Sequence, residues 1–294
     1  MEFIEKIDIK QTEVLNEDLT LAGDPNIAQT DQNLSIDGIF QQTNIPSLAR
    51  EICSVAELTG PSGALFNIIR KDDSSITLIR KEVEVFPSEI LKTSITREAI
   101  QDLKSQFGKD ADSIIGTLFR GLSNDVENEK LLTVLSANSK DYGDLQLSDS
   151  LNASTTAFEL TQRIHEIVLK INQKYQRSYE AFCILPAISM SSFMGLGSYL
   201  GSVKDSKGLF ITQIGKTKFY LNPDSTDLFA YVGLHDDNLS KSSLVLSPYQ
   251  NQILDAVNPD SGDIHYFLVN RFAITVSALH ELNNEMLYKF KVLV

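Results

Sequence analysis

Cations, cysteines and histidines are scarce in this sequence, and each shortage argues against a class of function. With 26 Lys and Arg against 39 Asp and Glu, the formal net charge is −13. Affinity for nucleic-acid backbones comes mainly from clustered Lys and Arg, so the charge argues against a nucleic-acid-binding surface. The two cysteines, Cys53 and Cys183, lie far apart in apolar contexts. That placement favours two buried reduced thiols over a disulfide or a metal pair.

Long hydrophobic runs are missing as well. The longest apolar stretches, such as residues 181–190, are too short to span a bilayer, and the start lacks the basic and apolar regions of a signal peptide. We therefore expect no membrane association and a protein made and used in a cytoplasm. At 294 residues and 42% hydrophobic content, the chain can form a substantial core, as one large domain or two closely packed lobes.

Motifs for catalysis, cofactors and metals are also missing. The pair His-Glu occurs at 165–166 and 280–281, without the second histidine that a zinc-protease helix needs. We predict that the protein is not an enzyme and that it has no cofactor and no metal site. The alternative is a soluble enzyme whose site is built from scattered residues, among them His165, His235 and Asp236.

The first 44 residues carry more than half of the negative charge. They hold nine acids against two bases, Lys6 and Lys10, a net charge of −7. The segment is rich in Gln and Asn and nearly free of aromatic residues, so it cannot bury enough apolar surface to fold alone. It is therefore either a disordered tail or an arm that becomes ordered on a neighbouring molecule.

Residue patterns after this arm predict long helices followed by many short strands, which is an α+β protein. The predicted helices cover 96–108, 110–135 and 156–175, the last opened by a capping box at Thr156 to Glu159, and the stretch 136–155 has loop chemistry. A short helix is expected from Pro186 through Phe193. The predicted strands are 64–70 and 76–86, joined by a hairpin turn at 71–75, and then 181–185, 209–214, 218–222, 228–233, 243–246, 266–269, 273–276 and 286–294.

Several short sequence motifs occur in a particular order along the chain. The earlier ones are Ile45-Pro46-Ser47-Leu48, Glu51-Ile52-Cys53-Ser54-Val55 and Pro61-Ser62-Gly63-Ala64-Leu65-Phe66. The later ones are Tyr231-Val232-Gly233, Ser247-Pro248-Tyr249, Asn258-Pro259, Arg271-Phe272 and Leu287-Tyr288-Lys289-Phe290-Lys291. In this order they resemble the major head protein of T-even-type contractile-tailed bacteriophages, although no single motif is specific alone.

The resemblance implies the Hong Kong 97-type phage capsid fold. It implies an N-terminal arm at 1–47, an extended β-hairpin loop at 52–92 that reaches onto a neighbour, a peripheral domain at 93–150 and 252–294 with a spine helix at 110–135, and an axial domain at 151–251. Inter-subunit contacts are expected at Gly60, Pro61, Gly63, Phe66, Ile45 and Pro46. Within the hairpin's entry, Gly60 to Gly63 is expected to need backbone angles that only glycine adopts readily.

The function implied is a major capsid protein that self-assembles as pentamers and hexamers into an icosahedral head. That head encloses double-stranded DNA without sequence-specific binding, and the expected location is the virion, with the host cytoplasm during assembly. Vertex, portal, scaffold and decoration proteins are the further partners implied. Alternatives with the same fold are a minor vertex protein and an encapsulin-like compartment shell. The sequence is shorter than the family's usual length because it lacks a long insertion between Phe66 and Ile90.

The charge and composition of the arm generate a first prediction. Deleting residues 1–44 removes no segment expected to pack inside the subunit, so circular dichroism and thermal unfolding of the remainder should change little. Closed shells should fail to form or vary in size, because an arm ordered on neighbours contributes contacts only in the assembled state. Electron microscopy and sedimentation of both chains, side by side, test this. Normal closed particles from the truncated chain would refute it.

Overall fold

The structure is a computed structural model that describes residues 47–70, 76–87, 89–107, 111–147, 153–175, 180–189, 209–236, 239, 241–259, 262–278, 280 and 285–293. Its helices are α3 (Leu48–Ile52), α4 (Arg97–Phe107), α5 (Ala111–Asn138) and α6 (Ala153–Tyr175), with a 3₁₀ turn η1 (Ala187–Ser189). Its strands are β1 (Ser54–Val55), β2 (Ser62–Arg70), β3 (Ile76–Glu84), β4 (Glu89–Ile95), β5 (Lys140–Gln146), β6 (Glu180–Leu185), β7 (Phe210–Ile214), β8 (Thr217–Leu221), β9 (Phe229–His235), β10 (Leu244–Val257), β11 (Ile264–Val276) and β12 (Leu287–Leu293).

Helices with strong periodicity lie close to where the sequence predicts them. Helix α4 begins after Thr96, whose hydroxyl oxygen accepts a hydrogen bond from the N–H of Ala99 at 3.2 Å and so caps the first turn. The long α5 is confirmed, while residue 108, the predicted end of the preceding helix, and residue 110, the predicted start of α5, lie outside the described residues. None of the described helices is long and apolar enough to cross a membrane.

Two features of residues 136–175 were predicted wrongly. Residues 140–146 form β5 instead of a loop, pairing in parallel with β12. This strand lies at the edge of its sheet and leaves most of its side chains exposed, so its sequence lacks the alternation that marks a strand. Helix α6 begins at Ala153, which places the proposed capping box inside the helix, where Thr156 is buried.

The observed strand lengths differ most from the predicted ones in the last third of the chain. The predicted strand 243–246 is the start of the much longer β10, and the two strands predicted at 266–269 and 273–276 form the single strand β11. Residues 251–257 of β10 are exposed on both faces, so no burial pattern marks them in the sequence. Strand β4 was not predicted, because it gains its order from pairing with the distant β11. Only residues 187–189 of the helix expected at 186–193 are described as helical, as η1, and 190–193 lie outside the described residues.

Contacts divide the chain into two compact units. Among the described residues, unit 1 contains 89–122 and 252–270, with β4 antiparallel to β11 and Leu91 opposite Leu268. Its core is formed by Ile115 and Phe119 of α5 against Tyr266 and Leu268 of β11. The two aromatic side chains are the largest members of this core and are at most 4% exposed.

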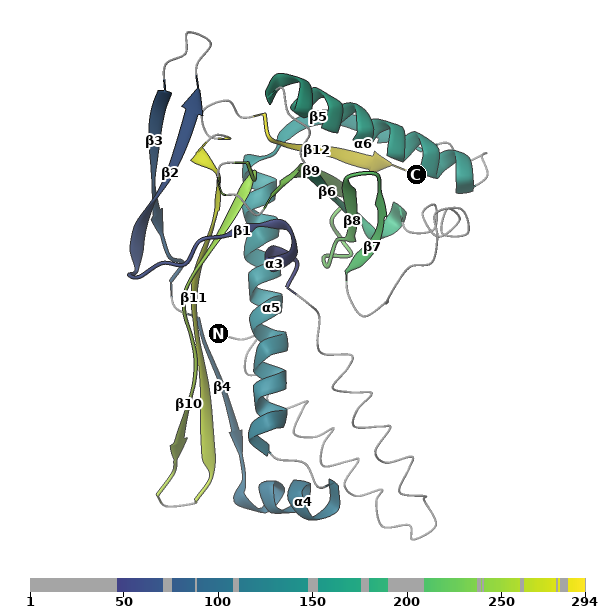
Figure 1. Ribbon diagram of the computed structural model, residues 1–294. Helices are drawn as coiled ribbons and strands as arrows, with labels where there is room; N and C mark the ends of the chain where they lie inside the picture. The colour runs from purple at the N-terminus through teal and green to yellow at the C-terminus, as the bar shows by residue number, and fades with distance from the viewer. Residues whose placement is uncertain are drawn as a thin grey trace. The chain divides into compact units, whose positions relative to one another are not determined.

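Unit 2 contains a mixed sheet in the order β5-β12-β9-β6-β8-β7. Its central strand β6 is parallel to β8 and antiparallel to β9, and alternate side chains of β6 enter different cores. Ala181, Cys183 and Leu185 pack with one face of α6, which lies across the sheet in Figure 1. On α6 this face is formed by Leu160, Ile164, Ile167 and Ile171.

The opposite face of the same sheet forms the second core of unit 2. Phe182 and Ile184 of β6 pack there with Leu131 and Leu135 of α5 and with residues of α3. Cys53 belongs to this core and Cys183 to the other, and both are free and buried, which confirms the reading of two buried thiols. Burial of both sheet faces explains why β6 reads as a continuous apolar run.

Gly233 of β9 gives a stability prediction. A Cβ atom at this position would lie 2.5 Å from Cζ of Phe182 and 2.6 Å from Cδ2 of Leu287, so Gly233→Ala must displace two core side chains. We expect it to lower the free energy of unfolding by about 1–3 kcal/mol. The control is Gly116→Ala in α5, where nothing lies within 4 Å and alanine should stabilise by about 0.5–1 kcal/mol.

Urea unfolding followed by circular dichroism, at concentrations below those at which subunits associate, measures both effects. Equal stability of the two variants would contradict the close packing at Gly233.

Candidate inter-subunit surfaces

The β2–β3 hairpin is the first candidate surface, and its strands pair with each other and with no other strand of the described chain. The register places Phe66 opposite Arg80 and Ile68 opposite Leu78. Because directly opposite residues share a face, Phe66, Leu78 and Arg80 lie on one face of the hairpin. These side chains are 56%, 61% and 62% exposed, respectively. Within the described chain, the hairpin therefore presents a face on which these three side chains are largely exposed.

The base of the hairpin, in contrast, is fixed to the rest of unit 2. The N–H of Val85 donates to the carbonyl oxygen of Pro61 at 3.0 Å and closes the base, while the N–H of Leu58 donates to the carbonyl oxygen of Pro248 at 3.0 Å. Phe86 packs edge-on against Phe272, with ring centroids 5.6 Å apart. The hairpin is thus held at its base, where Val83 is also buried, while Phe66, Leu78 and Arg80 farther along its strands are exposed.

Four of the six residues expected at inter-subunit contacts belong to this hairpin or its entry, and Ile45 and Pro46 lie outside the described residues. The expectation that Gly60 and Gly63 need glycine-only backbone angles is wrong, since neither has a positive φ. Gly63 is restricted by space instead, because a Cβ atom there would lie 2.5 Å from Cδ2 of Leu58. At Gly60 the nearest atom would be 3.6 Å away. Whether these residues contact another subunit stays a prediction.

Helix α3, which follows the arm, is clamped to α5 by polar contacts. Ser47 donates its hydroxyl proton to the carboxylate of Glu127, and Arg50 donates to both oxygens of that carboxylate at 3.1 and 2.9 Å. The side chain of Glu127 is 2% exposed, so its charge needs these donors. The next residue, Asn128, accepts the N–H of Leu48 at 2.7 Å. The clamp fixes the point at which the arm joins the subunit.

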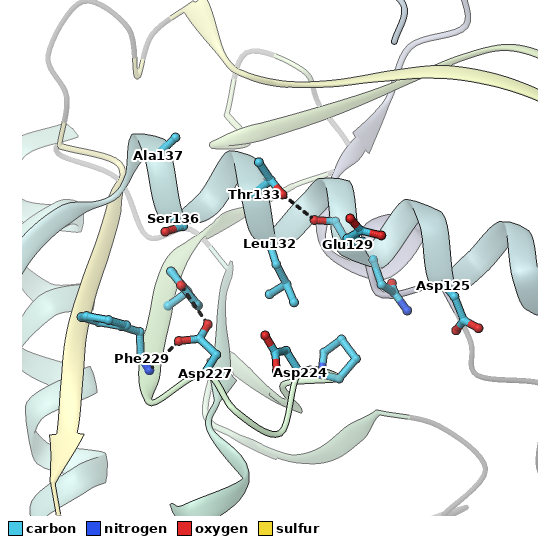
Figure 2. Close-up of a pocket in the computed structure, with 12 residues that line it drawn as sticks. Asp125, Glu129, Leu132, Thr133, Ser136, Ala137, Asp224, Asp227 and Phe229 are labelled. Carbon is cyan, nitrogen blue, oxygen red and sulfur yellow. Dashed lines mark hydrogen bonds between the residues drawn. The ribbon is translucent and has the colours of Figure 1, made fainter. Parts of the chain in front are cut away.

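A groove of about 940 Å³ lies in unit 2 between α5 and the turn that joins β8 to β9 (Figure 2). One wall is a stripe along α5, and the other is the segment from Pro223 to Tyr231. The stripe consists of Asp125, Asn128, Glu129, Leu132, Thr133, Ser136 and Ala137, which recur at three- and four-residue steps and so share one side of the helix. Figure 2 shows Leu132 directed between the two walls.

Carboxylates surround this groove. On the turn, Asp227 accepts from the hydroxyl of Tyr231 at 2.9 Å, the side-chain amide of Asn222 at 3.0 Å and the N–H of Phe229 at 3.0 Å. Asp224 accepts from the hydroxyl and N–H of Thr226, and these hydrogen bonds lower the pKa of its carboxyl. The hydrogen bonds accepted by Asp224 and Asp227 therefore fix the conformation of the turn.

The acids on the helix wall differ from those on the turn. Partial loss of water around its carboxyl raises the pKa of Asp125. Among the described residues, no ion pair includes Asp125, Glu129, Asp224 or Asp227. The groove is consequently acidic at its walls and apolar at Leu132 and Phe229.

The histidines do not form a reactive site. His165 lies on the exposed side of α6, and a ring nitrogen of His235 lies 3.0 Å from the carbonyl oxygen of Ile52. Asp236 pairs with Lys241 at 3.5 Å. Within the described ranges, no group of three or more His, Cys, Asp and Glu side chains is placed to hold a metal ion.

Sequence reasoning did not identify the clamp or the groove. Both depend on pairs far apart in the chain, such as Ser47 with Glu127, 80 residues apart. The available signal was the run of turn residues after Asn222 together with acids on the polar side of the α5 pattern. Neither shows that the two segments face each other.

Solved structures with a similar fold come from viral capsids and related shells. The capsid of Myoviridae phage XM1 superposes with a TM-score of 0.55 and 10% identity, over 84% of this chain and 92% of that one. A chain of Mycobacterium phage Che8 gives 0.52 and 11%, over 79% and 84%. The SrpI encapsulin of Synechococcus elongatus PCC 7942 gives 0.54 and 12%, over 85% and 88%. The likeness confirms the α+β, Hong Kong 97-type fold.

Sequence comparison identifies the family. No protein of curated function matches the sequence significantly. The family described as major capsid protein Gp23 matches residues 69–292, which is most of the chain. It is a family of structural proteins that form the phage head, so the prediction that the chain is not an enzyme is confirmed and the alternative of a scattered catalytic site is wrong. The chain thus belongs to the major capsid protein Gp23 family, and its place is in the virion.

Proposed function

We propose that this capsid protein assembles as pentamers and hexamers into an icosahedral head, and that the β2–β3 hairpin makes a principal contact with the neighbouring subunit. The observation that carries the proposal is the hairpin's lack of any other pairing strand in the described chain. A two-stranded ribbon is marginally stable alone, so it needs a surface to lie against. Burying an exposed apolar side chain such as Phe66 or Leu78 contributes about 1.5–3 kcal/mol, which favours contact with another copy.

The head is proposed to enclose double-stranded DNA without sequence-specific binding. The net charge of −13 supports this, because a wall that held phosphates would need clustered cations. Assembly is proposed to occur in the host cytoplasm. Vertex, portal, scaffold and decoration proteins are proposed as further partners of the shell.

The division of the subunit is proposed to follow the resemblance. Residues 1–47 form the arm, 52–92 the extended loop, 93–150 and 252–294 the peripheral domain, and 151–251 the axial domain. The polar clamp at Glu127 supports a boundary near residue 47, since Ser47 and α3 are tied to the subunit where the arm ends. Ile45 and Pro46 are proposed to join Gly60, Pro61, Gly63 and Phe66 in contacts between subunits.

Two roles share this fold, a minor pentameric vertex protein and an encapsulin-like compartment shell. The encapsulin likeness concerns the fold alone, at 12% identity, and the family match favours the major capsid protein. Negative-stain electron microscopy of the expressed protein, with copy number and nucleic-acid content of purified particles, tests the proposal. DNA-containing particles in which this chain is the main component support it, whereas a few copies per particle or a protein cargo would overturn it.

Gly63→Val tests the hairpin's entry. The valine must displace the half-buried Leu58 side chain at the point where the chain enters the hairpin, so the hairpin should leave the base in an altered direction. We expect a folded subunit by circular dichroism and a large loss of closed particles by electron microscopy.

Gly60→Val is the matched control, since a Cβ atom there meets nothing closer than 3.6 Å. It should assemble normally. Equal particle yields from both variants and the unaltered chain would count against the hairpin as an inter-subunit element.

A further inference from the structure

The groove beside α5 has an excess of negative charge that no ion pair within the described chain balances. Four of its lining residues are acids, and within the described chain none of the four forms an ion pair. Two of them, Asp125 and Glu129, lie one turn apart on the same side of α5. Neighbouring like charges on a helix destabilise it slightly, so a cation placed between them would be favourable.

The groove is also shaped for apolar side chains. Its volume of about 940 Å³ is that of a site for several side chains, and Leu132, Pro223 and Phe229 supply apolar surface between the acidic walls. An occupant should therefore present large apolar side chains next to a cation. None of the residues known to line the groove comes from the hairpin or from another exposed apolar segment of the same chain.

The N-terminal arm is a poor occupant, although it joins the subunit near Asn128. Its last cation is Lys10, and residues 11–46 contain acids but no Lys or Arg. Seated in the groove, it would add no positive charge. The exposed end of β10, with Ile253, Leu254 and Val257, carries only the acidic Asp255. On β4, Ile90 has Lys92 on its face, but that ammonium already lies 5.8 Å from the ring centre of Phe267.

The hairpin face that carries Phe66, Leu78 and Arg80 combines exposed apolar side chains with a cation. Phe66 and Leu78 are large, apolar and exposed, and Arg80 lies directly opposite Phe66 on the same face. Arg80 is paired with Glu82 at 3.2 Å, but both side chains are exposed. An exposed pair is worth only about 0–1 kcal/mol, so Arg80 can exchange it for a less hydrated partner.

We propose that Phe66, Leu78 and Arg80 of one copy enter the groove of a neighbouring copy. The two apolar side chains lie against Leu132 and Phe229, and the guanidinium of Arg80 lies between Asp125 and Glu129. This inference rests on the proposed assembly through the hairpin and adds the surface that receives it. The contact joins two different patches, so repeating it from copy to copy generates a ring when the rotation closes.

Charge exchange tests the pairing. Arg80→Glu and Glu129→Arg should each raise the critical concentration for assembly about tenfold, which corresponds to losing about 1.4 kcal/mol of coupling between the two charges. The double variant should recover to within about threefold of the unaltered chain. Both positions are exposed, so circular dichroism should show folded subunits throughout.

Two matched controls keep this experiment specific. Lys81→Glu makes the same charge change on the opposite face of β3, and Glu166→Arg makes it on the exposed side of α6. Combining Arg80→Glu with Glu166→Arg should bring no recovery. Recovery with this unrelated pair, or none with Glu129→Arg, would overturn the assignment.

Cross-linking tests the geometry directly. Both native thiols are fully buried, and burial raises their pKa, so they should not react. Subunits carrying Leu78→Cys, co-assembled with subunits carrying Thr133→Cys, should give cross-linked heterodimers with a short bismaleimide in particles and not in dissociated subunits. Glu166→Cys in place of Thr133→Cys is the negative control.

The outcomes separate the two proposals. If particles form and Gly63→Val blocks them, but Leu78→Cys does not link to Thr133→Cys, the hairpin's role stands and the groove assignment is wrong. A link from Thr133→Cys to a cysteine placed in the arm, such as Gln42→Cys, would assign the groove to the arm. Absence of any particle would overturn both proposals.

Discussion

The buried carboxylate of Glu127 is the contact on which the arrangement of the first described residues depends. Helix α3 has five residues, too few to be stable alone, so it needs tertiary contacts. Glu127 supplies them by accepting from Ser47 and Arg50, while Asn128 accepts the N–H of Leu48. Because a buried charge without donors is costly, this helix has one favourable position on α5.

Different sides of helix α5 contact different parts of the structure. Leu131 and Leu135 enter the core beneath the sheet, Glu127 and Asn128 hold α3, and Asp125 and Glu129 face the groove. Consecutive positions 127, 128 and 129 thus serve two neighbouring surfaces. A substitution at Asn128 would disturb both, since its side chain lines the groove and holds α3.

Several helices and strands could be predicted because patterns of neighbouring residues in the sequence mark them. The hairpin, α4, α5 and the buried strand β6 were found because their periodicity or turn residues lie within a few positions of each other. Strands β4 and β5 and the exposed part of β10 were missed, because distant pairing orders them. The motifs near Ile45 to Phe66 that suggested the family lie before the matched range 69–292, whereas the later motifs fall inside it.

The structure gives a physical reason for the identity of some residues within those motifs. Gly233 leaves room for Phe182 and Leu287, and Tyr231 donates its hydroxyl proton to Asp227 of the groove turn. Phe272 receives Phe86 at the base of the hairpin. The reason given for Gly63 was wrong because φ and packing cannot be separated from sequence alone. The candidate surfaces themselves could not be derived, since the sequence does not show which distant side chains face each other.

An acidic subunit that assembles with copies of itself must overcome its own repulsion. At a net charge of −13, copies repel at long range, and salt screens this over about 8–10 Å. Attraction must therefore come from apolar burial and from a few close pairs of opposite charge. In the contact proposed above, the exposed Arg80 opposite Phe66 and the acids of the groove form one such pair from two different surfaces of the subunit. A contact of this kind favours one register between neighbours and penalises others that bring acids together, so the scarcity of cations itself restricts how the copies can join.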